Sequence, residues 1–146
     1  MKNRQAEILL IEDSLPDIRL TERAFKSGKL QKRVSVVRDG VAALAYLRQE
    51  GDYVDAPRPD IILLDLGLPK KSGAEVLAEI KGDPSLKRIP VIVLTMSDAE
   101  TDVLDTYDRH ANAYTKKPVD MEEFVKTIKM IEDFWLSLVI LPRREL

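Results

Sequence analysis

Six polar side chains that could do chemistry stand directly after short, mostly apolar runs. They are Glu12, Asp13, Asp65, Thr95, Lys116 and Lys117. If these runs are parallel strands, their carboxyl ends share one edge of a sheet, and the side chains that follow them converge there. Carboxylates in such a group repel one another unless a cation joins them, and oxygen ligands suit Mg²⁺. A carboxylate beside Mg²⁺, a hydroxyl and an ammonium is equipped to accept a phosphoryl group, because the cations offset the charge on the transferring oxygens.

Apolar runs and helical segments alternate along the chain. The runs cover residues 8–11, 34–37, 61–64, 91–94 and 113–115. The first, third and fourth are continuous, as expected of parallel strands buried on both faces. Pro16 suits a first helical turn and Gly28 suits a helix end. Capping boxes are predicted at three later helix starts: Ser72 with Glu75, Ser97 with Glu100, and Asp120 with Glu123. The order predicts an α/β doubly wound sheet of five parallel strands with five helices.

The composition limits the possible classes of protein. The 146 residues are 45% hydrophobic and 33% charged, which fits one folded domain. The absence of cysteine excludes disulfide scaffolds, zinc fingers and thiol nucleophiles, and a single histidine excludes His-rich metal sites. A net charge of −2 gives no attraction to nucleic acid or an anionic membrane. No apolar run approaches the roughly 18–20 residues that span a bilayer, and no signal peptide fits. A cytoplasmic location is therefore expected, with neither nucleic acid nor membrane as a partner.

Four motifs make the sequence resemble the receiver domain of two-component response regulators over residues 6–134. The motifs are ILLIEDS, ILLDLGLPKKSG, VIVLTMS and AYTKKP, which begin at residues 8, 61, 91 and 113. Longer stretches, among them APRPDIILLDL and EDFWLSLVILP, are similar to the stand-alone regulators that serve cyanobacterial phytochromes. The resemblance implies a flavodoxin-like receiver fold with strand order 2-1-3-4-5. It also implies a signalling protein, not an enzyme, that catalyses only its own phosphorylation and dephosphorylation.

The resemblance also implies a role for each matching residue. Asp65 would accept a phosphoryl group from a histidine of a sensor kinase, which the second resemblance implies to be of the phytochrome type. Mg²⁺ would be bound directly by Asp13, Asp65 and the carbonyl of Gly67, and through water by Glu12. Thr95 and Lys117 would contact the phosphate. Tyr114 would be the aromatic side chain that swings inward when Thr95 moves.

Simpler interpretations of single residues stay open. Glu12 and Asp13 could favour a helix N-terminus through its macrodipole. Tyr114 could be an ordinary core residue, and Lys116 reads as surface charge. The acidic residues between 98 and 108 predict a solvated helix face that could also select a partner. Two positions depart from the family pattern. Met96 stands where a small residue is usual. Gly67 stands two residues after Asp65, at a position whose side chain often governs the attack of water on the phosphoaspartate.

The same residues bear on other classes of function. A P-loop nucleotidase and a dinucleotide enzyme both need glycines after the first strand, and EDSLPD has none. An aspartyl-phosphate phosphatase would need a general acid two residues after Asp65, and Gly67 cannot serve. The remaining alternative is a phosphorylation-independent scaffold or adaptor with a receiver fold, which the intact set of site residues disfavours.

The end of the chain carries more apolar side chains than one core needs. Residues 1–135 are expected to form the receiver domain, and residues 136–146 an apolar extension too short for an output domain. Phe134, Trp135, Leu136 and Leu138 follow the point where the core should be closed. A homodimer would cover them, although a tail folded back on its own domain is the alternative. Arg143 and Arg144 would then reach the acidic helix of the partner.

Overall fold

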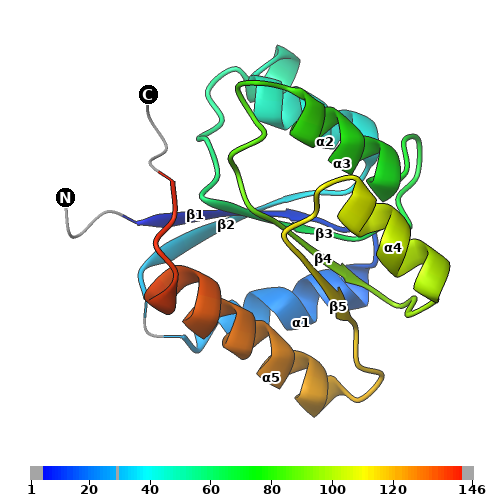
Figure 1. Cartoon of the computed structure of the whole chain (residues 1–146). Helices are drawn as coiled ribbons and strands as arrows, with labels where there is room; N and C mark the ends of the chain where they lie inside the picture. Colours follow the sequence, from blue (N-terminus) through cyan, green and yellow to red (C-terminus); the bar gives the residue numbers. More distant parts are fainter. Residues whose placement is uncertain (1–4, 29, 143–146) are drawn as a thin grey trace.

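A five-stranded parallel sheet forms the centre of the molecule (Figure 1). The computed structural model describes residues 5–28 and 30–142. The strands are β1 (Ala6–Ile11), β2 (Lys32–Val37), β3 (Ile61–Leu64), β4 (Val91–Thr95) and β5 (Ala113–Lys116). Their spatial order is β2-β1-β3-β4-β5. The predicted fold class and strand order are confirmed, and the strands extend the apolar runs by one or two residues at several ends.

Burial of the strands follows their place in the sheet. All residues of β3 and β4 are buried, and so is β1 after its first residue. The edge strands β2 and β5 are only partly buried. Continuous apolar runs therefore marked the central strands, and weaker patterns marked the edges.

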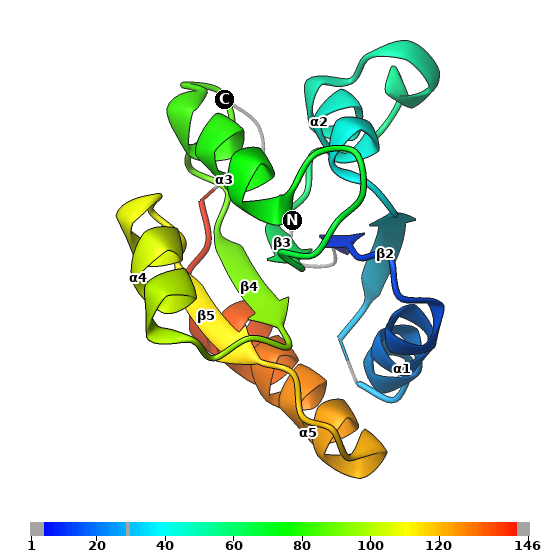
Figure 2. The same ribbon diagram turned by 90° about the vertical axis from the view of Figure 1, so that its right-hand side faces the viewer.

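Two helical layers cover the sheet. The helices are α1 (Leu15–Lys26), α2 (Gly40–Arg48), α3 (Gly73–Gly82), α4 (Glu100–Asp108) and α5 (Met121–Glu132). A short 3₁₀ turn covers Gly51–Tyr53. Figures 1 and 2 show α1 and α5 on one face of the sheet and α2, α3 and α4 on the other. Of these five helices, α4 buries the fewest residues against the rest of the protein, because Thr106 is its one buried residue. Within the described part of the chain, no helix is both long and apolar enough to cross a membrane.

Most of the predicted helix starts are confirmed. Pro16 lies in the first turn of α1, and Ser72 and Glu75 form a reciprocal capping box before α3. Asp120 accepts a hydrogen bond from the Glu123 amide at the start of α5. The box predicted for Ser97 and Glu100 is wrong. α4 begins at Glu100 itself, with Ala99 as a cap that has no side-chain bond.

Ser97 serves the loop before α4 instead. Its hydroxyl donates to Asp102 Oδ2 at 2.6 Å and accepts from the Ala99 amide at 3.2 Å. The spacing of a serine and a glutamate matched a capping box, but the loop from β4 is two residues longer than that box allows. The motif alone does not indicate the length of the loop between β4 and α4.

The chain stays helical beyond α5. A π-helical segment, Asp133–Leu138, follows directly, so helical backbone runs past the predicted end near Trp135 and across the predicted boundary at residue 136. Trp135, Leu136 and Leu141 pack against the core between the sheet and α1 and α5. Phe134 and Leu138 remain 50% and 72% exposed. Arg143 and Arg144 lie outside the described residues.

A buried ion pair closes the end of the sheet where the strands begin. Lys32 Nζ lies 3.1 Å from Glu132 Oε2, and these side chains are 7% and 4% exposed. The same ammonium donates to the Phe25 carbonyl at 2.8 Å. The pair thus joins β2, the end of α1 and the end of α5.

Candidate phosphoryl-acceptor site

The buried ammonium of Lys117 forms ion pairs with three carboxylates at the carboxyl edge of the sheet. Its Nζ lies 2.6 Å from Glu12 Oε1, 2.8 Å from Asp17 Oδ2 and 3.3 Å from Asp65 Oδ2. The Lys117 side chain is 2% exposed. The neighbouring Lys116 is exposed and pairs with Asp98 at 3.1 Å. Of the two lysines, Lys117 is the one that reaches the acids.

Backbone hydrogen bonds fix where these side chains emerge. The Glu12 amide donates to the Val37 carbonyl, and the Asp65 amide donates to the Ile11 carbonyl, both at 3.0 Å. The Lys117 amide donates to the Thr95 carbonyl at 2.7 Å. The sheet pairing therefore continues one residue beyond the strands and carries the site residues with it. Thr95 ends β4 and is buried.

Burial and charge shift the pKa values of the group in opposite directions. Burial raises the pKa of Glu12 to about 7, against the hydrogen bond from Lys117, which lowers it. Burial also raises the pKa of Asp65, but the Lys117 charge and the hydrogen bonds from Thr95, Glu12 and Lys117 outweigh it and bring the pKa below its usual value. Burial lowers the pKa of Lys117, yet its bonds to Asp17 and Glu12 raise it overall. The surroundings of Asp65 thus favour its carboxylate form, whereas burial disfavours that form for Glu12.

The acids fit a hard divalent cation in type and place. Glu12 is buried beside the partly buried Asp65, and burial raises the pKa of Glu12, so a second cation here would offset the cost of holding its carboxylate ionised. Asp13 is exposed, and its Oδ1 lies 3.8 Å from Nη2 of Arg38. Because both side chains are exposed, this ion pair holds the Asp13 carboxylate only weakly. Within residues 5–28 and 30–142, no three acidic or histidine side chains already stand in a metal-binding cluster. Asp13 therefore stands in an ion pair with Arg38 and not in a ready-made cluster with Glu12 and Asp65.

Tyr114 connects the loop after Thr95 to β5. Its hydroxyl donates to the Ser97 carbonyl at 2.8 Å, and its amide donates to the hydroxyl of Tyr107 at 3.2 Å. The side chain is partly buried against the core under α2 and α3. Tyr114 therefore contacts the loop that directly follows Thr95.

The geometry agrees with comparisons to known proteins. The profile of the family described as "Response regulator receiver domain" matches residues 8–129. The chain belongs to this family. Over 135 residues, and 92% of each chain, the receiver is 50% identical to the response regulator Rcp1 of Synechocystis sp..

Solved structures support the same assignment. The phosphorylated cyanobacterial phytochrome response regulator RcpA superposes with a TM-score of 0.94 at 51% identity, over 96% of this chain and 100% of the other. The Mn²⁺-bound form of Rcp1 superposes with a TM-score of 0.92 at 49% identity, over 94% and 99%. The receiver is a response regulator, and accepting a phosphoryl group is the function of this family.

Two residues of the receiver site escaped the sequence analysis. Asp17 contacts Lys117, and its signal was an acid in the first turn of the helix that follows Glu12 and Asp13. Gly73 packs on the backbone of the acceptor residue. A Cβ there would lie 2.3 Å from the Asp65 carbonyl oxygen and 2.5 Å from Leu66 Cα, which no side chain can satisfy.

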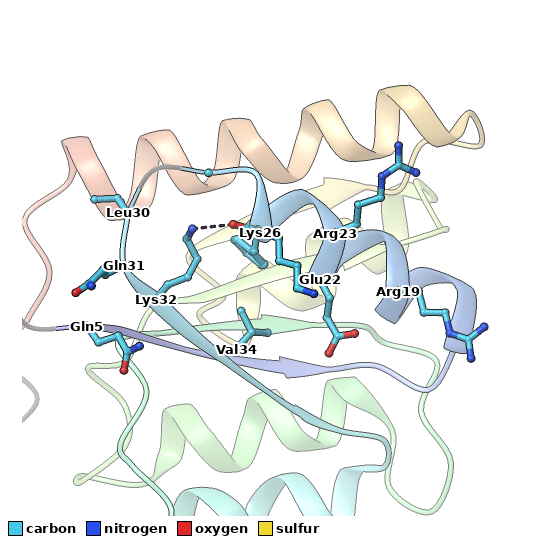
Figure 3. Close-up of a pocket in the computed structure, with 11 residues that line it drawn as sticks. Gln5, Arg19, Glu22, Arg23, Lys26, Leu30, Gln31, Lys32 and Val34 are labelled. Carbon is cyan, nitrogen blue, oxygen red and sulfur yellow. Dashed lines mark hydrogen bonds between the residues drawn. The ribbon is translucent and has the colours of Figure 1, made fainter.

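One sizeable hollow of the receiver lies away from this site. A cavity of about 730 Å³ opens between α1 and β2 (Figure 3). Arg19 points outward and Arg23 points toward α5, so their charges do not converge on one ligand. None of the predicted site residues lines this cavity.

Proposed function

We propose that Asp65 is the residue that accepts the phosphoryl group. The observation that carries this proposal is the contact of the buried Lys117 Nζ with Asp65 Oδ2 at 3.3 Å, within a group of acids of which Glu12 is buried and Asp65 partly buried. The lowered pKa of Asp65 keeps it a nucleophilic carboxylate. Lys117 supplies charge beside the transferring oxygens, and the Thr95 hydroxyl ends the neighbouring strand.

Magnesium is the metal that this donor set fits best. Asp13, Asp65 and the Gly67 carbonyl would hold it directly, and Glu12 through a water molecule. When bound, the metal would supply positive charge to the phosphoryl oxygens. Carboxylates and a carbonyl are oxygen ligands of the kind Mg²⁺ takes, and the related Rcp1 has been solved with Mn²⁺.

A sensor histidine kinase of the phytochrome type would donate the phosphoryl group. The support is the similarity of nearly the whole chain to Rcp1 and to RcpA, which is described as a phytochrome response regulator. We place the exchange in the cytoplasm, where a kinase draws its phosphate from ATP. The protein would catalyse only its own phosphorylation and dephosphorylation.

Thr95 and Tyr114 would pass the event to the surface. A phosphoryl group adds about two negative charges and strong acceptors beside Thr95. Movement of Thr95 toward them would shift Ser97, whose carbonyl holds the Tyr114 hydroxyl. The shift selects between two existing states of this loop.

A homodimer would use the apolar stripe formed by Met130, Phe134 and Leu138. These residues recur at every fourth position and are 66%, 50% and 72% exposed. Trp135 and Leu136, which were also predicted for the interface, pack partly on their own domain. The stripe is a helical surface that its own core leaves uncovered, and Ile140, which is 95% exposed, follows it along the chain.

Intact-mass spectrometry tests the acceptor directly. Native protein incubated with acetyl phosphate and Mg²⁺ should gain one phosphate, and EDTA should prevent the gain. Asp65→Asn should gain none, while the control Asp98→Asn, an exposed acid near the site, should behave as native. Phosphate retained by Asp65→Asn would show that another residue is the acceptor.

A further inference from the structure

Asp17 is the third acid on the Lys117 ammonium and the one that comes from a helix. Its Oδ2 lies 2.8 Å from Nζ, closer than Asp65 Oδ2 at 3.3 Å. A lysine ammonium has three donors and no acceptor, and Lys117 makes three contacts, all with carboxylates. Because Lys117 is 2% exposed, these acids replace the water that an ammonium otherwise needs.

The first turn of α1 fixes the position of Asp17. The Asp17 amide donates to the Ser14 hydroxyl at 3.4 Å, and the Asp17 carbonyl accepts from the Thr21 hydroxyl at 2.8 Å. Pro16 precedes it within the same turn, and Ile18 is buried behind it. The Asp17 carboxylate therefore stands on a helix end that is anchored on both sides.

The three acids differ in what else they must bind. In the function proposed above, Glu12 and Asp65 also bind the divalent cation, and Asp65 becomes an acyl phosphate. Asp17 has no such second task, since its one ion pair in the described structure is with Lys117. It is the acid that can stay with the ammonium through the whole reaction.

We propose that Asp17 is a positioning residue, which holds the Lys117 ammonium beside Asp65 while Glu12 and Asp65 turn to the metal. This inference rests on the proposed function. Without Asp17, Lys117 retains only Glu12 and Asp65 as partners and competes with the metal for them. The ammonium also loses the one contact that neither the metal nor the phosphoryl group shares.

Two measurements on the full chain test this role. In Asp17→Asn, the rate of phosphorylation by acetyl phosphate at saturating Mg²⁺ should fall roughly tenfold, as expected when a reacting group loses its position. The affinity for Mg²⁺, measured by calorimetry without phosphodonor, should fall roughly fivefold because the ammonium competes for the same ligands. The control Glu22→Gln changes an exposed acid on the same helix and should leave both values as native.

A variant that lacks the Lys117 ammonium separates positioning of Lys117 from a direct effect of the Asp17 charge on the metal. In Lys117→Met, adding Asp17→Asn should change the Mg²⁺ affinity less than twofold, because no ammonium is left to compete. Asp17→Glu should restore at least part of the phosphorylation rate, and circular dichroism should show that each variant is folded.

Three results would overturn the inference: native values in Asp17→Asn, an equal loss of metal affinity in both backgrounds, or no recovery in Asp17→Glu. Failure of the proposed function looks different, because the native chain itself would then take up no phosphate.

Discussion

Gly67 is the residue at which the lifetime of the phosphorylated state can be changed without changing the fold. It stands two residues after Asp65, and a Cβ built there would meet no atom within 4 Å. Gly67→Leu should therefore fold with native stability, and the added side chain should exclude water from Asp65. We expect the rate of phosphate loss to fall by roughly two- to fivefold. Intact-mass spectrometry after removal of the phosphodonor would measure this rate. A native or shorter lifetime would show that water reaches Asp65 from another side.

Lys81 gives the protein a pH-dependent stability outside the acceptor site. Burial lowers its pKa to about 8 from 10.5. Both partners of its Nζ are neutral carbonyl oxygens, of Lys87 and Ile89, at 2.9 and 2.8 Å. Between pH 8 and 10.5 the unfolded chain thus binds more protons at this residue than the folded chain does. Its contribution to the free energy of unfolding is least favourable below pH 8 and rises with pH across this window.

Urea unfolding at pH 7 and pH 9.5 checks the sign. The free energy of unfolding of native protein, minus that of Lys81→Gln, should be larger at pH 9.5. The control Lys126→Gln, an exposed lysine on α5, should show no such change. A difference that falls with pH for Lys81→Gln would contradict the assignment.

Among the structural elements, β2 and α5 are joined by a second buried lysine–carboxylate pair, whose ammonium also bonds the end of α1, far from the acceptor site. Breaking one side of the Lys32–Glu132 pair leaves an uncompensated buried charge, so Glu132→Ala should lower the free energy of unfolding by about 3–5 kcal/mol. Replacing both, by Lys32→Met and Glu132→Leu, should recover most of this loss because neither charge remains. The exposed pair of Lys126 and Glu123 is the matched control, and Lys126→Ala should cost less than about 1 kcal/mol. A loss in the double variant as large as in Glu132→Ala would show that packing, not charge, holds this end.

The sequence predicted the elements because their signals are local. Continuous apolar runs marked β1, β3 and β4, and Ser72 with Glu75 marked the start of α3. The same kind of signal failed at Ser97, because the length of the loop after β4 is set by tertiary contacts and not by residue spacing.

The acceptor site was predicted from the ends of strands and not from its contacts. Glu12, Asp65 and Lys117 converge as expected, since the topology requires it. The contact of Asp17 with Lys117 joins residues one hundred positions apart, and the spacing of neither residue indicates it. The close packing of Gly73 on Asp65 likewise depends on how α3 lies over the sheet.

At the scale of the whole molecule, the apolar stripe of Met130, Phe134 and Leu138 is the surface whose covering decides the assembly state. The native chain of 16.6 kDa should sediment at about twice that mass at micromolar concentration. Phe134→Ser combined with Leu138→Ser should give a monomer, because both side chains lose apolar area that the partner would cover. Val119→Ser is the control: Val119 is 87% exposed, lies outside the stripe, and should leave the dimer intact. A native chain that sediments as a monomer with and without phosphate would exclude the dimer.

The shallow attachment of α4 has a consequence for how such proteins diversify. Since Thr106 is the one buried residue of this helix, exposed positions such as Leu104 and Asp105 can be rewritten with little effect on folding. Copies of the chain that differ only there would keep the same acceptor chemistry and the same core, yet present different surfaces to their partner proteins. After gene duplication, a few substitutions on this single helix would be enough to insulate two signalling channels from each other.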